Sequence, residues 1–270
     1  MFDRFFGFTE TPFQRHVPPE KLLRTERLKA AIRRLSFVVQ KRGVGVLTGP
    51  PGCGKTTVIR ALCSELADQR LRFHYVLACR QEPGGLLRRI AWDLGIEAFR
   101  GFDLERKLKE ELRARLSKHL TTVIVVDEAQ NLSSECLWEL AHLVSRDMDS
   151  ENSAALILVG QKALLERLSL AVNEPFAQRV LLYHSLPPAP REEVLEYLAW
   201  QLTRVGGKPS IFKPNSKELI YTASGGALRV VDQIATEALC LAAERNLRSV
   251  DNELVAQAID NLRALKQRES

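Results

Sequence analysis

The sequence has few cysteines, and they are not arranged for a metal site or a disulfide framework. Its 270 residues include five, with no Cys-x-x-Cys pair and no histidine at ligand spacing. This spacing argues against a zinc site and is typical of reduced thiols in a cytosolic protein. A chain of this length buries about 75% of the surface that its unfolded form exposes, so its core needs no disulfide.

Long apolar runs and a secretion signal are also missing. The longest apolar run, AALILVG at 154–160, has the length of a strand, whereas a membrane helix needs about 20 apolar residues. The opening residues, MFDRFFGFTETPF, lack the basic start and apolar core of a signal peptide. We therefore expect a cytoplasmic protein without a membrane partner.

Positive charge is in modest excess, and it is unevenly distributed. The chain has 39 Lys and Arg against 33 Asp and Glu, a formal net charge of +6. Residues 1–60 carry a net +8 and residues 70–120 a net +5, whereas residues 121–160 carry −6. Two interpretations remain open: solvated helix faces, or a surface that faces a polyanion.

Apolar patterning alternates between strand and helix in the first two thirds of the chain. The expected strands are 43–49, 73–79, 121–128 and 154–160, and the expected helices are 56–69, 85–96, 104–120 and 136–144. This alternation predicts an α/β fold with a parallel sheet covered by helices. After the prolines near residue 188 the pattern is helical only. We predict an α/β domain at 1–187, beginning with an extended segment at 1–25, and a smaller all-helical domain at 188–270.

A phosphate-binding loop lies between the first predicted strand and helix. Glycines in such a loop let successive N–H groups face phosphate oxygens, and the following helix adds its dipole. We expect Lys55 to reach the β- and γ-phosphates of ATP, Thr56 to bind Mg²⁺ and the Thr57 hydroxyl to reach another phosphate. The motif G-x-x-x-x-G-K-T consists of Gly49, Pro50, Pro51, Gly52, Cys53, Gly54, Lys55 and Thr56.

Two acids, Asp127 and Glu128, end the strongest predicted strand, TTVIVVDE. An aspartate at the carboxyl end of a parallel strand lies beside the phosphate loop, where it can hold a water molecule bound to Mg²⁺. Glu128 is the candidate that orients and deprotonates the attacking water. Unpaired buried carboxylates are costly, so packing alone does not explain this pair. The two motifs together predict ATP hydrolysis.

Five sequence blocks occur in an order that is shared with known proteins. They are FFGFTETPF, VLTGPPGCGKTTVIRAL, VVDEAQNLS, LILVGQKALLERL and ASGGALRVVDQIATEAL, and they span nearly the whole chain. Together they resemble AAA+ ATPases, in particular the branch that includes ExeA, TniB, TnsC and MuB. The resemblance implies an AAA+ P-loop fold in which the helical domain is a lid.

The resemblance also implies roles for three residues outside the two motifs. Gln161 matches sensor 1, which reads the γ-phosphate, and Arg229 matches sensor 2, which reaches the nucleotide from the lid. Arg179 matches the arginine finger that acts on the ATP of a neighbouring subunit, where it stabilises transition-state charge. A surface or salt-bridged arginine is the alternative for Arg179.

Two functions occur within this branch. ExeA-like secretion proteins continue into a membrane helix and a peptidoglycan-binding region, and this sequence ends after the lid, so we expect the transposition type. Such proteins form rings or helical filaments on double-stranded DNA with ATP, and they recruit or activate a transposase, with a target-selection protein as a further partner. A secretion or envelope assembly ATPase that acts through protein partners is the alternative.

Binding to the DNA backbone requires basic residues rather than base-reading motifs. The sequence offers several in the loops and helix starts after the second predicted strand. A solvated helix face is the alternative for each of them singly. The candidates are Arg80, Arg88, Arg89, Arg100, Arg106 and Lys107.

Overall fold

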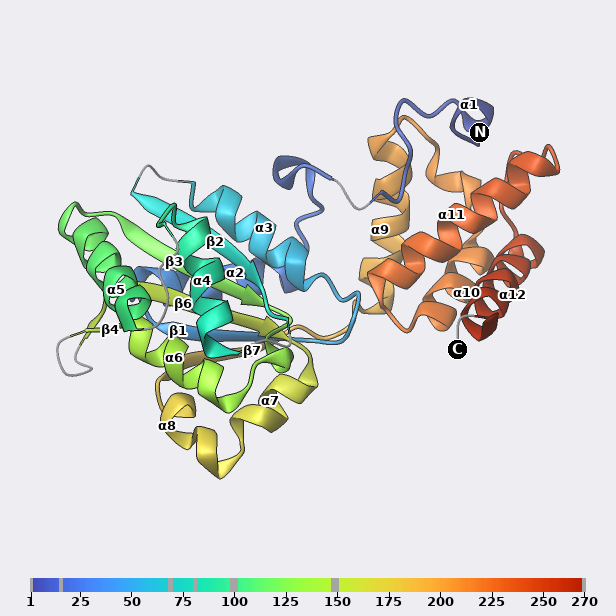
Figure 1. Ribbon diagram of the computed structural model, residues 1–270. Helices are drawn as coiled ribbons and strands as arrows, with labels where there is room; N and C mark the ends of the chain where they lie inside the picture. Colours follow the sequence, from blue (N-terminus) through green and yellow to red (C-terminus); the bar gives the residue numbers. More distant parts are fainter. Residues whose placement is uncertain are drawn as a thin grey trace. The chain divides into compact units, whose positions relative to one another are not determined.

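The computed structural model describes residues 2–14, 17–67, 70–79, 82–97, 102–146 and 151–268. The chain divides into two compact units, which are described separately (Figure 1). The α/β unit consists of Glu26–Pro50 and Lys55–Leu186. The helical unit consists of Met1–Thr25, Pro51–Gly54 and Pro187–Ser270.

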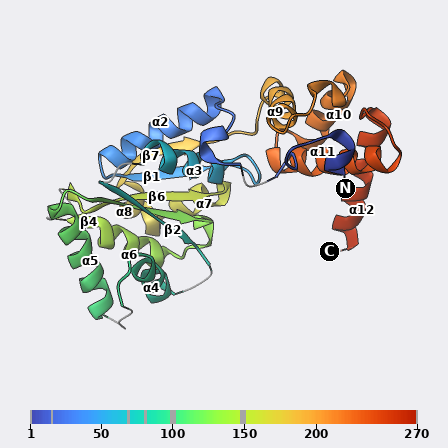
Figure 2. The same cartoon turned by 90° about the horizontal axis from the view of Figure 1, so that it is seen from above.

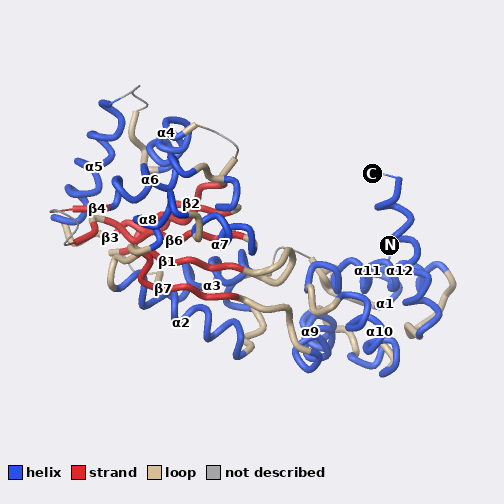
Figure 3. Tube along the Cα trace, turned by 90° about the horizontal axis from the view of Figure 1, so that it is seen from below, coloured by secondary structure: helices blue, strands red, loops and turns tan. Residues whose placement is uncertain are grey.

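A five-stranded parallel sheet forms the centre of the α/β unit. Its order is β2–β3–β6–β1–β7 (Figure 3). The three inner strands are apolar and buried almost throughout, as expected for parallel strands covered on both faces, whereas exposure alternates along the two edge strands. The strands are β1 (Val44–Thr48), β2 (Leu71–Leu77), β3 (Thr121–Asp127), β6 (Ala154–Gly160) and β7 (Val180–Ser185).

Helices cover both faces of this sheet (Figure 2). One face carries α2 (Glu26–Gln40) and α3 (Lys55–Glu65), and the other carries α4 (Pro83–Asp93), α5 (Phe102–Ser117) and α6 (Ser134–Val144). Three leucines of α5, Leu104, Leu108 and Leu112, are buried in the core that α5 shares with α4 and α6. The α/β fold with a helix-covered parallel sheet is therefore confirmed.

Shorter elements connect the sheet strands. A two-residue antiparallel pair, β4 (Ser145–Arg146) and β5 (Glu151–Asn152), precedes β6. The turn η2 (Ala129–Asn131) follows β3. After β6 come α7 (Lys162–Leu168), η3 (Ala171–Asn173) and α8 (Glu174–Ala177), which lead to β7.

Several elements of the α/β unit lie outside the predictions from the sequence, including α2, β7 and the short helices α7 and α8. Helix α2 is rich in charge, which hides its apolar positions, yet these recur at three- and four-residue intervals and face the sheet. They are Leu28, Ala31, Ile32, Leu35, Val38 and Val39. Strand β7 is short and stands directly before the proline-rich segment, where a strand signal is easily missed.

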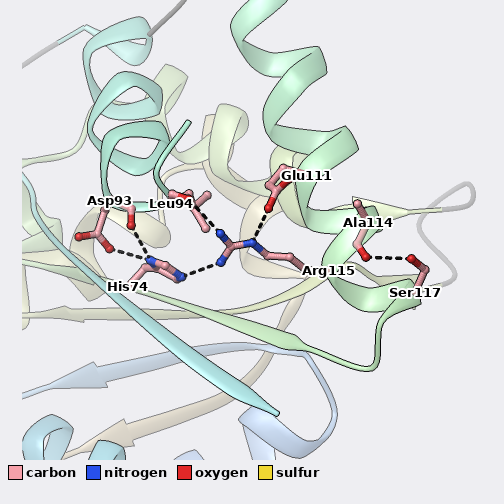
Figure 4. A network of polar contacts seen from close by, with 7 residues as sticks. All are labelled: His74, Asp93, Leu94, Glu111, Ala114, Arg115 and Ser117. Atoms are coloured by element: carbon pink, nitrogen blue, oxygen red, sulfur yellow. Dashed lines mark hydrogen bonds and ion pairs between the residues drawn. The ribbon is translucent and has the colours of Figure 1, made fainter. Parts of the chain in front are cut away.

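A polar network ties edge strand β2 to α4 and α5 (Figure 4). His74 is buried, with Nδ1 2.8 Å from an Asp93 carboxylate oxygen and Nε2 3.2 Å from Arg115 Nη1. Arg115 also donates to the Leu94 carbonyl at 2.9 Å and to Glu111 at 2.8 Å. Because a guanidinium only donates, His74 accepts at Nε2 and carries its proton at Nδ1, where it donates to Asp93.

Four long helices dominate the helical unit. They are α9 (Arg191–Arg204), α10 (Pro214–Ser224), α11 (Leu228–Glu244) and α12 (Asn252–Arg268), with the short turns η1 (Pro19–Lys21) and η4 (Pro209–Ile211). Their apolar faces enclose one core. Among the described residues, no helix of the chain is long and apolar enough to cross a membrane.

The N-terminal segment belongs to the helical unit rather than to the α/β unit, and it is not extended throughout. It begins with α1 (Phe2–Phe6), and its aromatic side chains enter the core of the helical unit because burial removes them from water. Phe13 packs edge-on against Phe212 at 6.1 Å, and its N–H donates to Gln201. This packing corrects the expectation of an extended segment in the α/β domain.

Candidate active site

The carboxyl ends of the parallel strands meet at one edge of the sheet, and the predicted motifs lie there. Thr48 is in register with Gly160, and the N–H of Gly49 donates to the Gly160 carbonyl at 3.2 Å. Strand β6 pairs with β1 on one side and with β3 on the other, and β3 ends at Asp127. The phosphate loop, the two acids and Gln161 therefore leave the sheet at the same edge.

The phosphate loop has the backbone that its glycines predict. Gly52 and Gly54 have φ angles of +77° and +103°, a region that side chains other than glycine rarely adopt. Helix α3 begins at Lys55, directly after the loop, and the N-terminus of a helix favours phosphate groups. Cys53 is buried in the loop, whereas Pro50, Pro51 and Thr56 are exposed and Thr57 is half-buried.

Lys55 is buried without a counter-ion. Its side chain is 9% exposed, and Nζ donates to the carbonyls of Gly49 at 2.9 Å and Pro50 at 3.0 Å. Within the described residues, no carboxylate forms an ion pair with it. Buried ammonium groups are costly unless they meet a negative charge, so this lysine suits an anionic ligand such as a nucleotide phosphate.

Both carboxylate oxygens of Asp127 are engaged within the protein. Oδ1 accepts the N–H of Glu128 at 2.8 Å, and Oδ2 accepts the hydroxyl of Tyr75 at 2.5 Å. Burial and then the nearby Asp127 carboxylate raise the pKa of Tyr75, so its hydroxyl remains a donor. The motif did not reveal Tyr75, which stands on the neighbouring strand β2 in register with Val125.

Glu128 is held in an unusual backbone conformation. Its φ and ψ of 53° and 36° lie in the left-handed region, at a cost of about 1–2 kcal/mol for a residue with a Cβ. Its Oε2 accepts from Nε2 of Gln130 at 2.5 Å. Gln130 Oε1 in turn accepts the backbone N–H of Gln161 at 3.1 Å. The candidate base is therefore linked to the end of β6.

The donor atoms at this edge suit a magnesium ion. Thr56 supplies a hydroxyl and Asp127 a carboxylate, and hard oxygen ligands of this kind are the ones that Mg²⁺ prefers. In the described ranges, no group of three or more His, Cys, Asp or Glu side chains could hold a metal ion. A Mg²⁺ here would therefore need phosphate oxygens and water among its ligands.

The two predicted arginines, Arg179 and Arg229, belong to different units of the chain. Arg179 lies between α8 and the amino end of β7. Because β7 runs parallel to β1, this is the opposite end of the strands from the phosphate loop of the same copy. It is half-buried and donates from Nη1 to Ser145 Oγ at 3.1 Å. Arg229, in the helical unit, opens α11, and its backbone N–H lies 3.4 Å from the Gly52 carbonyl of the same unit.

The predicted DNA contacts differ in their surroundings. Arg80 and Arg100 lie outside the described residues. Arg88 is exposed on α4, and Arg89 donates to the Leu77 carbonyl at 3.0 Å. On α5, Arg106 forms ion pairs with Glu110 at 2.8 Å and Asp103 at 3.5 Å. Lys107 on the same helix is engaged in polar or electrostatic contacts as well. Acids therefore offset much of the charge on α5.

A basic excess lies on α2 and just after it, and none of its residues is among the predicted DNA contacts. Residues 26–42 contain six Lys and Arg and one acid, Glu26. Arg33, Arg34 and Lys41 are exposed, and the Phe37 side chain between them is 44% exposed. Arg34 reaches the Tyr183 carbonyl at 3.2 Å, so this basic face continues onto edge strand β7.

Comparison with known proteins agrees with this geometry. Residues 38–168 match the family model of an AAA domain. General secretion pathway protein A of Aeromonas hydrophila is 30% identical over 97% of this chain and 49% of its own length. The chain thus spans about half the length of the curated relatives it matches.

Solved structures share the fold. The crystal structure of Cdc6p from Pyrobaculum aerophilum has a TM-score of 0.73 and 19% identity, covering 95% of this chain and 70% of that one. The Aeropyrum pernix ORC1 protein in complex with DNA has a TM-score of 0.67 and 21% identity, covering 89% and 66%.

Proposed function

We propose that this chain, whose residues 38–168 match the model of an AAA domain, hydrolyses ATP at contacts between its copies and thereby regulates DNA transposition. The proposal has three parts: hydrolysis at the candidate site, assembly of copies, and binding to double-stranded DNA. Each part has its own supporting observation and its own test.

Hydrolysis rests on the buried ammonium of Lys55, which has no carboxylate partner among the described residues and lies at the same end of the sheet as the two acids. Lys55 and the loop N–H groups bind the β- and γ-phosphates, and Thr56 with Asp127 holds Mg²⁺. When bound, Mg²⁺ neutralises charge on the phosphate oxygens. Glu128 accepts the proton of the attacking water, and Gln161 and Arg229 sense the nucleotide.

The test of hydrolysis separates binding from chemistry. Lys55→Ala weakens ATP binding by at least about tenfold, because it removes the charged donor to phosphate. Glu128→Gln keeps ATP binding and lowers kcat by at least about 100-fold, because an amide cannot accept the proton. Phosphate release and binding of a fluorescent ATP analogue measure the two effects. A wild-type protein that releases no phosphate would refute this part.

The place of Arg179 supports the assembly of copies. At the far edge of the sheet this side chain does not serve its own phosphate loop. An arginine that stabilises transition-state charge in a neighbour makes hydrolysis depend on assembly. We propose a ring or helical filament of identical subunits, in which each Arg179 completes the site of the next copy.

DNA binding rests on the basic surface and on the resemblance to transposition regulators. Structural relatives include a protein solved in complex with DNA, although at 21% identity this likeness concerns the fold. Arg88, Arg89, Arg106 and Lys107 stay candidates, and the exposed cations of α2 join them. Electron microscopy with a non-hydrolysable ATP analogue, with and without duplex DNA, tests whether assemblies need both. A transposase is the expected partner, with a target-selection protein beside it.

Secretion is the second candidate function, because a secretion pathway protein matches 97% of this chain. An ATPase of that kind acts through protein partners. The affinity of a DNA-binding protein falls steeply as salt rises, since phosphate contacts release counterions. Assembly that is indifferent to DNA and to salt would favour secretion, and salt-sensitive assembly on DNA would favour transposition.

A further inference from the structure

Gln130 joins two parts of the candidate site that are distant in sequence. Its Nε2 donates to Glu128 Oε2 at 2.5 Å, and its Oε1 accepts the N–H of Gln161 at 3.1 Å. The first contact spans two residues and the second thirty-one. One amide therefore connects the carboxylate after β3 with the end of β6.

The chemistry of both partners fixes the direction of this amide. A carboxylate only accepts and a backbone N–H only donates, so the NH₂ group faces Glu128 and the carbonyl faces Gln161. A side chain at position 130 must offer a donor at one side and an acceptor at the other. Glutamine does so; ionised glutamate keeps only the acceptor, and methionine has neither.

The end of β6 is shaped to receive this amide. A Cβ at Gly160 would lie 2.8 Å from Gln130 Oε1, so any larger residue would displace it. The carbonyl of Gly160 accepts the N–H of Gly49, the first residue of the phosphate loop. The segment that anchors Gln130 is therefore the segment to which the phosphate loop is tied.

The carboxylate that Gln130 holds retains a free oxygen. No hydrogen bond from the described residues reaches Oε1 of Glu128, whereas Oε2 is taken by Gln130. The left-handed backbone of Glu128 costs free energy and requires surrounding contacts to maintain it. The amide of Gln130 is one such contact, and it leaves Oε1 to accept a proton.

We propose that Gln130 is a positioning residue, which holds the Glu128 carboxylate in place relative to the phosphate loop through the Gln161 and Gly160 backbone. This inference rests on the proposed ATP hydrolysis, with Glu128 as the base. Gln130 acts through the Glu128 carboxylate and takes no direct part in the chemistry. Its loss misplaces the base and leaves the nucleotide-binding groups unchanged.

The test measures kcat, KM for ATP, affinity for a fluorescent ADP analogue and Tm. Gln130→Met keeps the length of the side chain and lowers kcat by about 10–100-fold, with KM, ADP affinity and Tm nearly unchanged. Gln130→Glu retains the acceptor for Gln161 and loses the donor to Glu128, so its kcat falls as well. Asn131→Ala is the matched control: it lies in the same turn, and its side chain is directed to the Ala78 carbonyl.

A double-mutant cycle distinguishes positioning from general damage. In a Glu128→Gln background, adding Gln130→Met lowers the residual kcat by less than twofold, because the base that it positions is already absent. A fully additive loss would overturn the proposal, as would a Gln130→Met kcat within twofold of wild type. Equal losses of ADP affinity and kcat would also overturn it. If the wild-type protein fails to hydrolyse ATP, the proposed function itself is refuted instead.

Discussion

Burial alters the chemistry of individual side chains, as the thiol of Cys63 on α3 illustrates. Desolvation raises its pKa to about 11. At pH 8 only about one thiol in a thousand is then ionised, compared with roughly a quarter for an ordinary cysteine. Iodoacetamide therefore alkylates Cys63 roughly 200-fold more slowly in the native chain than in the denatured chain, and the rate rises as pH approaches 11. Mass spectrometry of the Cys63 peptide measures this, and equal rates at pH 8 would contradict it.

Residue roles differ in how far the sequence reveals them. The expectations for Lys55, Thr56, Asp127 and Glu128 come from local motifs, since covalent spacing alone brings such residues to strand ends. The contacts of Tyr75 and Gln130 are different, because they depend on which strands become neighbours. Tyr75 meets an acid 52 residues away, and Gln130 meets a backbone group 31 residues away. No motif encodes these pairs.

At the scale of elements, the hydrogen bonds of Arg115 connect β2, α4 and α5, and their contribution to the free energy of unfolding can be measured. Arg115→Ala removes the donors to His74 and to the Leu94 carbonyl, and it leaves both acceptors partly buried. We expect the free energy of unfolding to fall by about 1–3 kcal/mol, the usual cost of unsatisfied buried groups. Arg113→Ala, an exposed change on the same helix, should cost less than about 0.5 kcal/mol. Urea denaturation compares the two, and equal losses would contradict the role of the network.

Helix α2, which the sequence did not predict, carries exposed cations that extend the proposed DNA-binding surface. Its basic face invites a direct test by charge reversal, with Arg33→Glu and Lys41→Glu combined. If α2 contacts DNA phosphates, affinity for duplex DNA falls at least about tenfold, and the dependence of log K on log salt becomes shallower by up to about 2. Lys208→Glu with Lys213→Glu, two exposed residues of the helical unit that are not candidate DNA contacts, changes the net charge equally and is the control. Similar losses in both pairs would indicate a general charge effect rather than a surface on α2.

At the scale of the whole molecule, the alternation of strands and helices was sufficient to predict a parallel sheet but not the order of its strands. The order β2–β3–β6–β1–β7 places β1 between strands that are far along the chain. That order brings the two acids and Gln161 to the phosphate loop, and it places Arg179 at the opposite edge. Strand order depends on long-range packing, and the local periodicity of the sequence carries no information about it.

The position of Arg179 leads to a prediction about mixed assemblies. Arg179→Ala and Glu128→Gln each bind ATP and hydrolyse it at least about 100-fold more slowly than wild type. In an equal mixture, a copy with Glu128 can meet a neighbour with Arg179, so about one quarter of the interfaces are complete. Phosphate release by the mixture should therefore reach about a quarter of the wild-type rate.

The hydrogen bond from Arg179 to Ser145 supplies the control for this mixing experiment. Ser145→Ala removes an acceptor of the guanidinium and keeps the guanidinium itself, so its hydrolysis should stay within about twofold of wild type. A mixture no faster than the mean of its two variants would refute the shared site. So would a lone Arg179→Ala variant that hydrolyses ATP at the wild-type rate, because the site of each copy would then be complete without its neighbour.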